Sequence, residues 1–194
     1  MSEFYTGVKF DSVPMNRKMV SHILLPELKK WCAIFSEFGF APVYEGGTAG
    51  NLSFRTSGES NGFIVTGSYT KLDDQMNNGD FVEVIECIPD RRLILYNGLK
   101  SPSSESFMHY YVYRNRPNIG AVFHGHSEEI MKQALKKGYP ETAKETEYGT
   151  IELAESILPY LDSPVIVIKN HGFLSIGRTC QEAGNRVLEL VKVS

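Results

Sequence analysis

The spacing of apolar residues changes along the chain and predicts a different structure for each part. Between residues 25 and 38, apolar side chains recur every three or four positions, which is typical of an amphipathic helix. Gly39 follows this run directly, so we expect the helix to end there. The preceding segment lacks a regular period and contains Pro14, which predicts an irregular N-terminal arm over residues 1–24.

Short apolar runs separated by Gly, Asn, Asp and Ser occupy the region between residues 40 and 96. This pattern predicts strands joined by tight turns. The predicted strands cover residues 51–55, 63–66, 81–88 and 92–95.

The rest of the chain alternates predicted helices with strongly apolar strands. The helices cover residues 105–114, 128–137, 151–161 and 179–192, and the strands cover residues 120–123 and 165–168. Ser127 and Gly138 are expected to cap the second of these helices, and Thr150 the third. Early strands followed by interspersed helices predict an α/β sandwich with a mixed or largely antiparallel sheet. No internal repeat or long linker divides residues 1–194, so we expect one domain.

Composition narrows the class of protein. Apolar residues make up 42 % of the chain and charged residues 22 %, which is ordinary for a globular protein. The formal net charge of -3 argues against a protein built mainly to bind nucleic acid. No apolar run approaches the roughly 20 residues of a membrane-spanning helix, and no secretory signal is visible. Cys32, Cys87 and Cys180 are scattered and odd in number, which favours a reducing compartment, so we expect a cytoplasmic protein.

Two histidines predict a metal site at the end of one strand. His124 and His126 flank Gly125 immediately after the apolar run at residues 121–123. Residues i and i+2 of a strand point to the same face, so both imidazoles would leave the strand on one side. Gly125 has no side chain to obstruct them and permits a sharp exit into the next helix. Neutral imidazole is a common ligand of zinc and other divalent metals.

A third histidine stands in a similar context. His171 follows the apolar strand at residues 165–168 and precedes Gly172. Three histidines with an open fourth position are the usual arrangement of a catalytic zinc. Taken alone, a His-x-His motif is equally compatible with hydrogen-bonded core or surface histidines. His22 and His109 lack this strand-end context, and we expect them to be structural.

Small polar residues supply candidate anion sites. Ser103 or Ser104 is expected to cap the helix at residues 105–114 and to present its hydroxyl and backbone N–H groups to an anion. Glu105 would then lie in the first helical turn, where the helix dipole alone can account for a carboxylate. Small-residue turns at residues 46–53 and 66–68 could wrap backbone N–H groups around a phosphate, although each is also an ordinary turn.

Taken together and in this order, the motifs resemble the class II aldolase/adducin family. That family includes fuculose-phosphate and rhamnulose-phosphate aldolases, ribulose-phosphate 4-epimerases and methylthioribulose-phosphate dehydratase. The matching segments are Gly47-Thr48-Ala49-Gly50-Asn51-Leu52-Ser53, Val65-Thr66-Gly67, Pro102-Ser103-Ser104-Glu105, Arg116-Pro117 ahead of His124-Gly125-His126, Tyr148-Gly149-Thr150 and Asn170-His171-Gly172. They span most of the chain.

The resemblance implies a three-layer αβα sandwich and often a homotetramer with active sites between neighbouring subunits. It implies that a zinc ion, or alternatively manganese, cobalt or iron, is held by His124, His126 and His171. The residues implied to bind the substrate phosphate are Gly50, Asn51, Thr66, Gly67, Ser103 and Ser104. Glu105 matches the acid/base glutamate of the aldolases. The epimerases are expected to carry Asp there, so Glu favours an aldolase or a dehydratase.

We therefore expect a zinc-dependent class II aldolase that reversibly cleaves a small phosphorylated ketose, such as fuculose phosphate, through an enediolate. One alternative is a sugar-phosphate 4-epimerase, dehydratase or decarboxylase of the same family. Another is a non-catalytic adducin-like association module, which predicts missing ligands, whereas the three histidines and Glu105 are all present. Compared with the fuculose-phosphate aldolase, the segment between His126 and Tyr148 is shorter and lacks its tyrosine-bearing stretch, and the C-terminal tail is reduced. Tyr139, Tyr148 or a neighbouring subunit is expected to complete the site.

Overall fold

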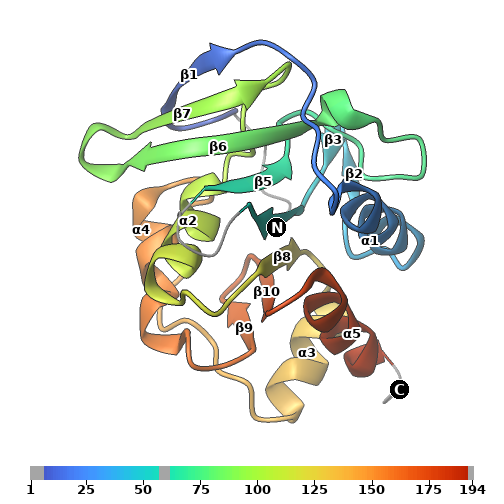
Figure 1. The fold of residues 1–194 in the computed structure, drawn as a ribbon. Coiled ribbons are helices and arrows are strands. Elements are labelled where there is room, and N and C mark those ends of the chain that lie inside the picture. Colours follow the sequence, from blue (N-terminus) through green and yellow to red (C-terminus); the bar gives the residue numbers. More distant parts are fainter. Residues whose placement is uncertain (1–6, 57–61, 192–194) are drawn as a thin grey trace.

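The computed structural model describes residues 7–56 and 62–191, and its centre is an eight-stranded sheet (Figure 1). The strand order is β1-β7-β6-β5-β4-β8-β10-β9. The strands are β1 (Asp11–Asn16), β4 (Asn51–Arg55), β5 (Phe63–Thr66), β6 (Phe81–Ile88), β7 (Leu93–Gly98), β8 (Ala121–Gly125), β9 (Val165–Ile168) and β10 (Gly172–Gly177). β1 runs parallel to β7 and the other neighbouring pairs are antiparallel, which confirms the predicted mixed, largely antiparallel sheet. Two short strands, β2 (Val43–Tyr44) and β3 (Gly47–Thr48), form a separate antiparallel pair.

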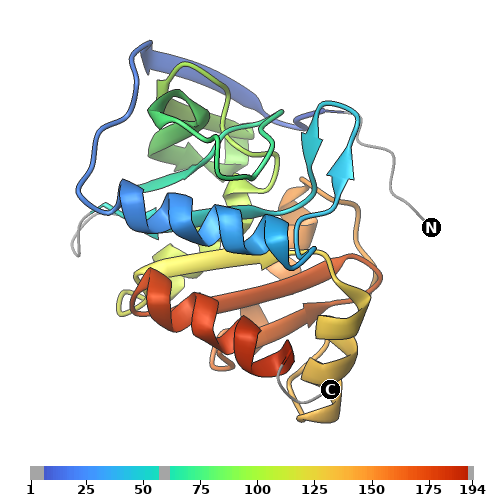
Figure 2. The same ribbon diagram turned by 90° about the vertical axis from the view of Figure 1, so that its right-hand side faces the viewer.

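Helices cover both faces of the sheet. In the described part of the chain they are α1 (Leu25–Glu37), α2 (Ser106–Asn115), α3 (Glu128–Lys136), α4 (Ile151–Ser156) and α5 (Cys180–Val191), with 3-10 helices η1 (Asn78–Asp80), η2 (Pro89–Arg91) and η3 (Leu158–Tyr160). Figures 1 and 2 show α1, α3 and α5 on one face and α2 with α4 on the other. The expected three-layer αβα sandwich is therefore confirmed.

The sheet separates two apolar cores. Val122 of β8 packs into the core beneath α2 and α4, whereas its neighbour Phe123 packs against Trp31 and Phe35 of α1. Successive strand residues point to opposite faces, so one strand contributes to both cores. Every residue of β8 is buried, as expected for a central strand covered by helices on both sides. The strand that carries His124 is therefore packed from both faces.

Local sequence signals account for several helix boundaries. Gly39 follows α1 in the left-handed conformation (φ 69°). The side chains of Ser127 and Thr150 each accept a hydrogen bond from a backbone N–H in the first turn of α3 and α4. These limits confirm the predictions made from sequence. The predicted helix at residues 151–161 is interrupted after α4 and resumes as η3, which has Pro159 in its first turn.

Two strands of the eight-stranded sheet differ from the expectations, and the short strands β2 and β3 also lack predicted counterparts. The prediction of an irregular arm over residues 1–24 is wrong for residues 11–16. These residues form β1, which pairs with β7 at the edge of the sheet. An edge strand tolerates proline, and the register shifts beside Pro14. β10 has no predicted counterpart, because polar Ser175 interrupts its apolar run, although the Ser175 hydroxyl is buried and donates to the Ala183 carbonyl. Residues 1–6 of the expected arm lie outside the described residues.

Among the helices of the described residues, none combines the length and the apolar character needed to cross a bilayer.

Candidate metal centre

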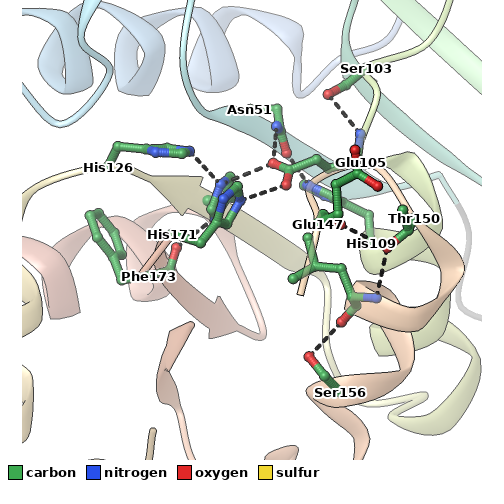
Figure 3. A network of polar contacts seen from close by, with 12 residues as sticks. Asn51, Ser103, Glu105, His109, His126, Glu147, Thr150, Ser156, His171 and Phe173 are labelled. Atoms are coloured by element: carbon green, nitrogen blue, oxygen red, sulfur yellow. Dashed lines mark hydrogen bonds and ion pairs between the residues drawn. The ribbon is translucent and has the colours of Figure 1, made fainter. Parts of the chain in front are cut away.

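Four potential ligands converge from separate elements of the fold. Glu105 directly precedes α2, His124 lies in β8, His126 follows that strand, and His171 lies between β9 and β10. Each residue offers one ligand atom, and these atoms all lie within 4.8 Å of one another. Figure 3 shows His126, His171 and Glu105 turned toward a common point. The three histidines singled out in the sequence therefore meet, and Glu105 joins them.

Close packing around the last residue of β8 requires glycine at position 125. A Cβ atom there would lie 2.6 Å from the ring of Phe173 and 2.8 Å from the Phe40 carbonyl oxygen, so any side chain would clash. The same Phe40 carbonyl accepts a hydrogen bond from the backbone N–H of His126 over 2.8 Å. This contact fixes the chain as it leaves β8 and helps to hold the His126 ring beside that of His124.

The turn that carries His171 is shaped by two neighbouring residues. Asn170 adopts the left-handed conformation (φ 56°), which asparagine tolerates better than most residues. A Cβ atom on Gly172 would lie 2.5 Å from the Gly125 carbonyl oxygen and 2.9 Å from Cε1 of His124. Glycine at position 172 thus lets the two histidine-bearing segments approach each other.

The hydrogen bonding of His124 indicates that the site is built for a cation. His124 Nδ1 lies 2.9 Å from the carbonyl oxygen of Phe173, which can only accept, so Nδ1 carries the proton. In a neutral ring Nε2 then presents a lone pair, 2.9 Å from His126 Nε2 and 2.9 Å from Glu105 Oε2. A lone pair facing a carboxylate oxygen is repulsive, so this contact is favourable only when a proton or a metal cation lies between the two atoms. The donor set therefore fits a divalent metal ion.

The charges at the site suit metal binding as well. Burial alone would raise the pKa of Glu105, but His124 and His171 together hold the pKa of that carboxyl well below its usual value. Burial, reinforced by the neighbouring His124 and His171, lowers the pKa of His126. A carboxylate anion and a neutral imidazole are the forms of these side chains that bind metals.

A cavity of about 300 Å³ opens beside these residues, and its lining includes Glu105, His126 and His171. Five of the six residues predicted to bind phosphate line the same cavity: Gly50, Asn51, Gly67, Ser103 and Ser104. Thr66 does not line it, because this residue is buried and its hydroxyl faces the backbone N–H of Leu52 over 3.4 Å. Thr48 and Ser68, from the two small-residue turns noted in the sequence, line the cavity as well, together with Tyr69, which the sequence did not indicate.

The start of α2 differs from the expectation. Glu105 occupies the N-cap position rather than the first turn, and no side chain caps the helix there. Ser103 Oγ lies 3.4 Å from the backbone nitrogen of Glu105 and accepts its hydrogen, whereas Ser104 makes no capping bond. From this position before the helix, the Glu105 side chain reaches His171, with Oε1 2.7 Å from Nε2.

Only one of the two candidate tyrosines lies at this cavity. Tyr148 is among the lining residues, whereas Tyr139 packs against the apolar core that contains Ile130 and Ala134 of α3. Of the two tyrosines, only Tyr148 is therefore in contact with the cavity.

Comparison with known proteins assigns the chain to a family. Residues 28–194 match the model of the class II aldolase and adducin N-terminal domain. The chain belongs to this family. The resemblance seen in the sequence motifs is thus confirmed. With this cluster of potential metal ligands, the protein is an enzyme of the class II aldolase family.

Curated relatives include aldolases and a dehydratase. An L-fuculose phosphate aldolase of Methanococcus maripaludis is 30 % identical over 154 residues, covering 72 % of this chain and 79 % of the relative. One from Methanococcus vannielii is 34 % identical over 96 residues, covering 42 % of this chain, and the match spans only 52 % of that relative. A methylthioribulose-1-phosphate dehydratase of Leptospira biflexa is 29 % identical over 129 residues, covering 64 % of this chain and 60 % of the relative.

A solved structure of an L-fuculose 1-phosphate aldolase shares the fold. The two structures align with a TM-score of 0.70 at 24 % sequence identity, over 90 % of this chain and 84 % of that chain. This likeness concerns the arrangement of the elements, and the site itself rests on the side-chain geometry described above.

Proposed function

We propose that this protein is a metal-dependent class II aldolase that reversibly cleaves a small phosphorylated ketose of the fuculose-phosphate type. One observation carries the proposal. Four potential ligands, Glu105, His124, His126 and His171, converge within 4.8 Å of one another, and three of them line a cavity shared with the predicted phosphate-binding residues.

The phosphate group would be held by small and amide side chains together with backbone N–H groups. Ser103 and Ser104 supply hydroxyls to the cavity lining, to which Gly50 and Gly67 also belong. Asn51 donates from its side-chain nitrogen to Glu105 over 3.0 Å. An amide nitrogen carries two hydrogens, so Asn51 can serve Glu105 and a substrate oxygen together.

The proposed chemistry assigns different tasks to the cation and to Glu105. A divalent cation held by His124, His126 and His171 would stabilise the negative charge that carbon–carbon cleavage leaves on the substrate oxygens. Glu105 would carry the proton to or from the reacting carbon as general acid and base. The bound phosphate would keep that carbon in place, since orientation lowers the barrier. We propose zinc as the cation, with manganese, cobalt or iron as alternatives.

A dehydratase acting on a related sugar phosphate is the second candidate. The similarity to the Leptospira methylthioribulose-1-phosphate dehydratase supports it, and the same set of ligands and acid/base group would serve it. An association module without catalysis is disfavoured, because such a module has no need for three converging imidazoles and a buried carboxylate.

The assembly and location are part of the proposal. We propose a homotetramer in which a neighbouring subunit helps to cover the cavity, and the large exposed side chains of Met15, Met19 and Ile23 offer apolar contact surface. Light scattering should then give the mass of four chains. We propose a cytoplasmic location because the three cysteines are free and buried.

A screen of phosphorylated ketoses tests the reaction. Metal-loaded protein should release dihydroxyacetone phosphate from L-fuculose 1-phosphate, whereas a dehydratase would convert 5-methylthioribulose 1-phosphate without breaking a carbon–carbon bond. His171→Ala should lose bound metal and turnover together, while His22→Ala, outside the site, should retain both. Full turnover in His171→Ala, or absence of bound metal from the wild-type protein, would contradict the proposal.

A further inference from the structure

A chain of hydrogen bonds leads from Glu105 into the interior of the molecule. Asn51 Nδ2 donates to Glu105 Oε2 over 3.0 Å, and Asn51 Oδ1 lies 2.5 Å from His109 Nε2. His109 Nδ1 lies 2.6 Å from Ser53 Oγ, which lies 2.7 Å from the Tyr113 hydroxyl. All five residues are buried, and Figure 3 shows the link between Glu105, Asn51 and His109. Four of these side chains play no part in binding the proposed metal.

The spacing of residues on α2 and β4 explains how this chain of hydrogen bonds is formed. Glu105, His109 and Tyr113 are spaced four residues apart at the start of α2 and along it, so they lie on one face of the helix. Asn51 and Ser53 are two residues apart on β4 and point to one face of the sheet. The helix face and the strand face meet, and polar groups from the two elements alternate along the contact.

The direction of each hydrogen bond follows from the Glu105 end. A carboxylate can only accept, so the Asn51 amide must present its nitrogen to Glu105 and its oxygen to His109. That oxygen also accepts, so the proton of His109 must be on Nε2. In a neutral ring Nδ1 then accepts from the Ser53 hydroxyl, and the oxygen of Ser53 accepts from Tyr113. Each shared hydrogen in the chain therefore has one donor and one acceptor.

The surroundings of His109 favour the neutral ring. Its side chain is fully buried, and it stacks against Phe63 with ring centroids 6.2 Å apart and an interplanar angle of 15°. Burial lowers the pKa of His109 to about 3, and the nearby His124 acts in the same direction, whereas Glu105 acts in the opposite one. A ring that stays neutral has a single hydrogen to donate.

We infer that His109, as the neutral Nε2–H tautomer, is a positioning residue that fixes the side-chain amide of Asn51 and, through it, the carboxylate of Glu105. Without the His109 donor, the amide of Asn51 could rotate by half a turn and direct its oxygen at the carboxylate, which would displace Glu105. The catalytic consequence rests on the proposed function, in which Glu105 moves the proton. The assignment of the tautomer does not depend on the proposed function. His109 is thus more than the structural residue expected from its position in the sequence.

Nitrogen NMR of histidine-labelled wild-type protein tests the tautomer without any substrate. Long-range correlations distinguish a protonated ring nitrogen from a bare one, and the His109→Gln spectrum identifies the signals of position 109. We expect a protonated Nε2 and a bare Nδ1 throughout the range from about pH 5 to about pH 8, where an ordinary histidine titrates. A proton on Nδ1, or a ring that becomes charged in this range, would overturn the inference.

Two matched variants test the consequence for Glu105. In His109→Gln the side-chain nitrogen reaches the position of Nε2 and can still donate to Asn51, whereas in His109→Asn the shorter amide cannot. With zinc-loaded protein and L-fuculose 1-phosphate, we expect kcat of His109→Asn to fall by about 10- to 100-fold. We expect KM to rise by a smaller factor than kcat falls, because a rotated Asn51 amide weakens one contact with the substrate but misplaces the carboxylate that moves the proton. His109→Gln should keep most of the wild-type kcat, and both variants should keep bound metal and similar melting temperatures.

The outcomes separate this inference from the proposed function. Equal losses of kcat in the two variants, or an unchanged kcat in His109→Asn, would overturn the positioning role. If wild-type protein cleaves none of the sugar phosphates, the proposed function fails. The NMR result then decides the inference alone, since the orientation of the Asn51 amide does not depend on which reaction Glu105 serves.

Discussion

Glu105 is held by partners on both of its carboxylate oxygens. Oε1 lies 2.7 Å from His171 Nε2, while Oε2 lies 2.9 Å from His124 Nε2 and accepts from Asn51 over 3.0 Å. A side chain fixed in this way is oriented before a substrate arrives, so less entropy is lost when a proton is transferred. The arrangement gives a carboxylate that is both ionised and immobile beside the cavity.

Replacing Glu105 by glutamine tests its role directly. Glu105→Gln keeps the size of the side chain but removes the group that takes up a proton, so kcat should fall by at least about 100-fold. Metal content should stay close to that of the wild-type protein, because the three imidazoles remain. Steady-state cleavage of L-fuculose 1-phosphate and elemental analysis of the purified variant measure the two effects. Wild-type turnover in this variant would remove Glu105 from the mechanism.

The buried ring of His109 should make folding stability depend on pH. Its pKa is about 3 in the folded protein and close to the ordinary value of 6.5 in the unfolded chain. Between these values the unfolded chain binds a proton that the folded protein excludes. The contribution to stability is therefore complete above the unfolded pKa and declines as the pH falls, by about 1.4 kcal/mol per pH unit.

Urea denaturation of wild-type protein and His109→Gln at two pH values isolates this contribution. Between about pH 7.5 and about pH 5, the stability advantage of the wild-type protein should shrink by about 2 kcal/mol, because the variant lacks the titrating ring. Both proteins carry the same metal ligands, so the pH dependence of metal binding cancels in the comparison. A difference that stays constant over this range would show that His109 is charged or accessible in the folded state.

At the scale of elements, the close approach of β8 to the start of β10 depends on the glycine at position 172. Gly172→Ala would place a Cβ atom 2.5 Å from the Gly125 carbonyl oxygen and 2.9 Å from the His124 ring. Overpacking of this kind destabilises by about 1–3 kcal/mol, and here the strain falls on two metal ligands. We expect a lower melting temperature together with weaker zinc binding.

A glycine far from the site provides the matched control. Gly138 has a positive φ of 83°, but a Cβ atom there would meet nothing within 4 Å, so alanine is strained at this position without touching a neighbour. Gly138→Ala should lower stability by about 1 kcal/mol and leave zinc affinity unchanged. Equal zinc affinity in both variants would show that the approach at Gly172 does not shape the site.

Elements whose signals are local could be predicted from the sequence, and those that depend on distant partners could not. The strands β4, β5, β6 and β9 match their apolar runs, and α3 begins at a serine cap as expected. β1 exists because β7 pairs with it, and nothing within its own residues outweighs Pro14. The start of α2 differs from the prediction because Glu105 is drawn toward His124 and His171, which follow it in the chain by many residues.

The same distinction applies to the candidate site. The histidine motifs could be found because each stands beside a glycine at a strand end. The role inferred for His109 was hidden, because it depends on which face of α2 meets which face of β4. The spacing of Glu105, His109 and Tyr113 along that helix is the signal that could have revealed it.

At the scale of the whole molecule, the candidate metal site joins distant parts of the chain, and Glu105 and His171 are 66 residues apart in sequence. The unfolded chain does not hold these ligands together, so a bound cation should stabilise the fold by its binding free energy. At free zinc about 100-fold above the dissociation constant, the gain is about 2.7 kcal/mol, or a rise of about 5–10 °C in melting temperature. A chelator should abolish this gain and added zinc should restore it, whereas His171→Ala should melt at nearly the same temperature under both conditions. A wild-type melting temperature that is unaffected by the chelator would mean that the converging side chains hold no metal, and that their contacts are those of an ordinary buried polar cluster.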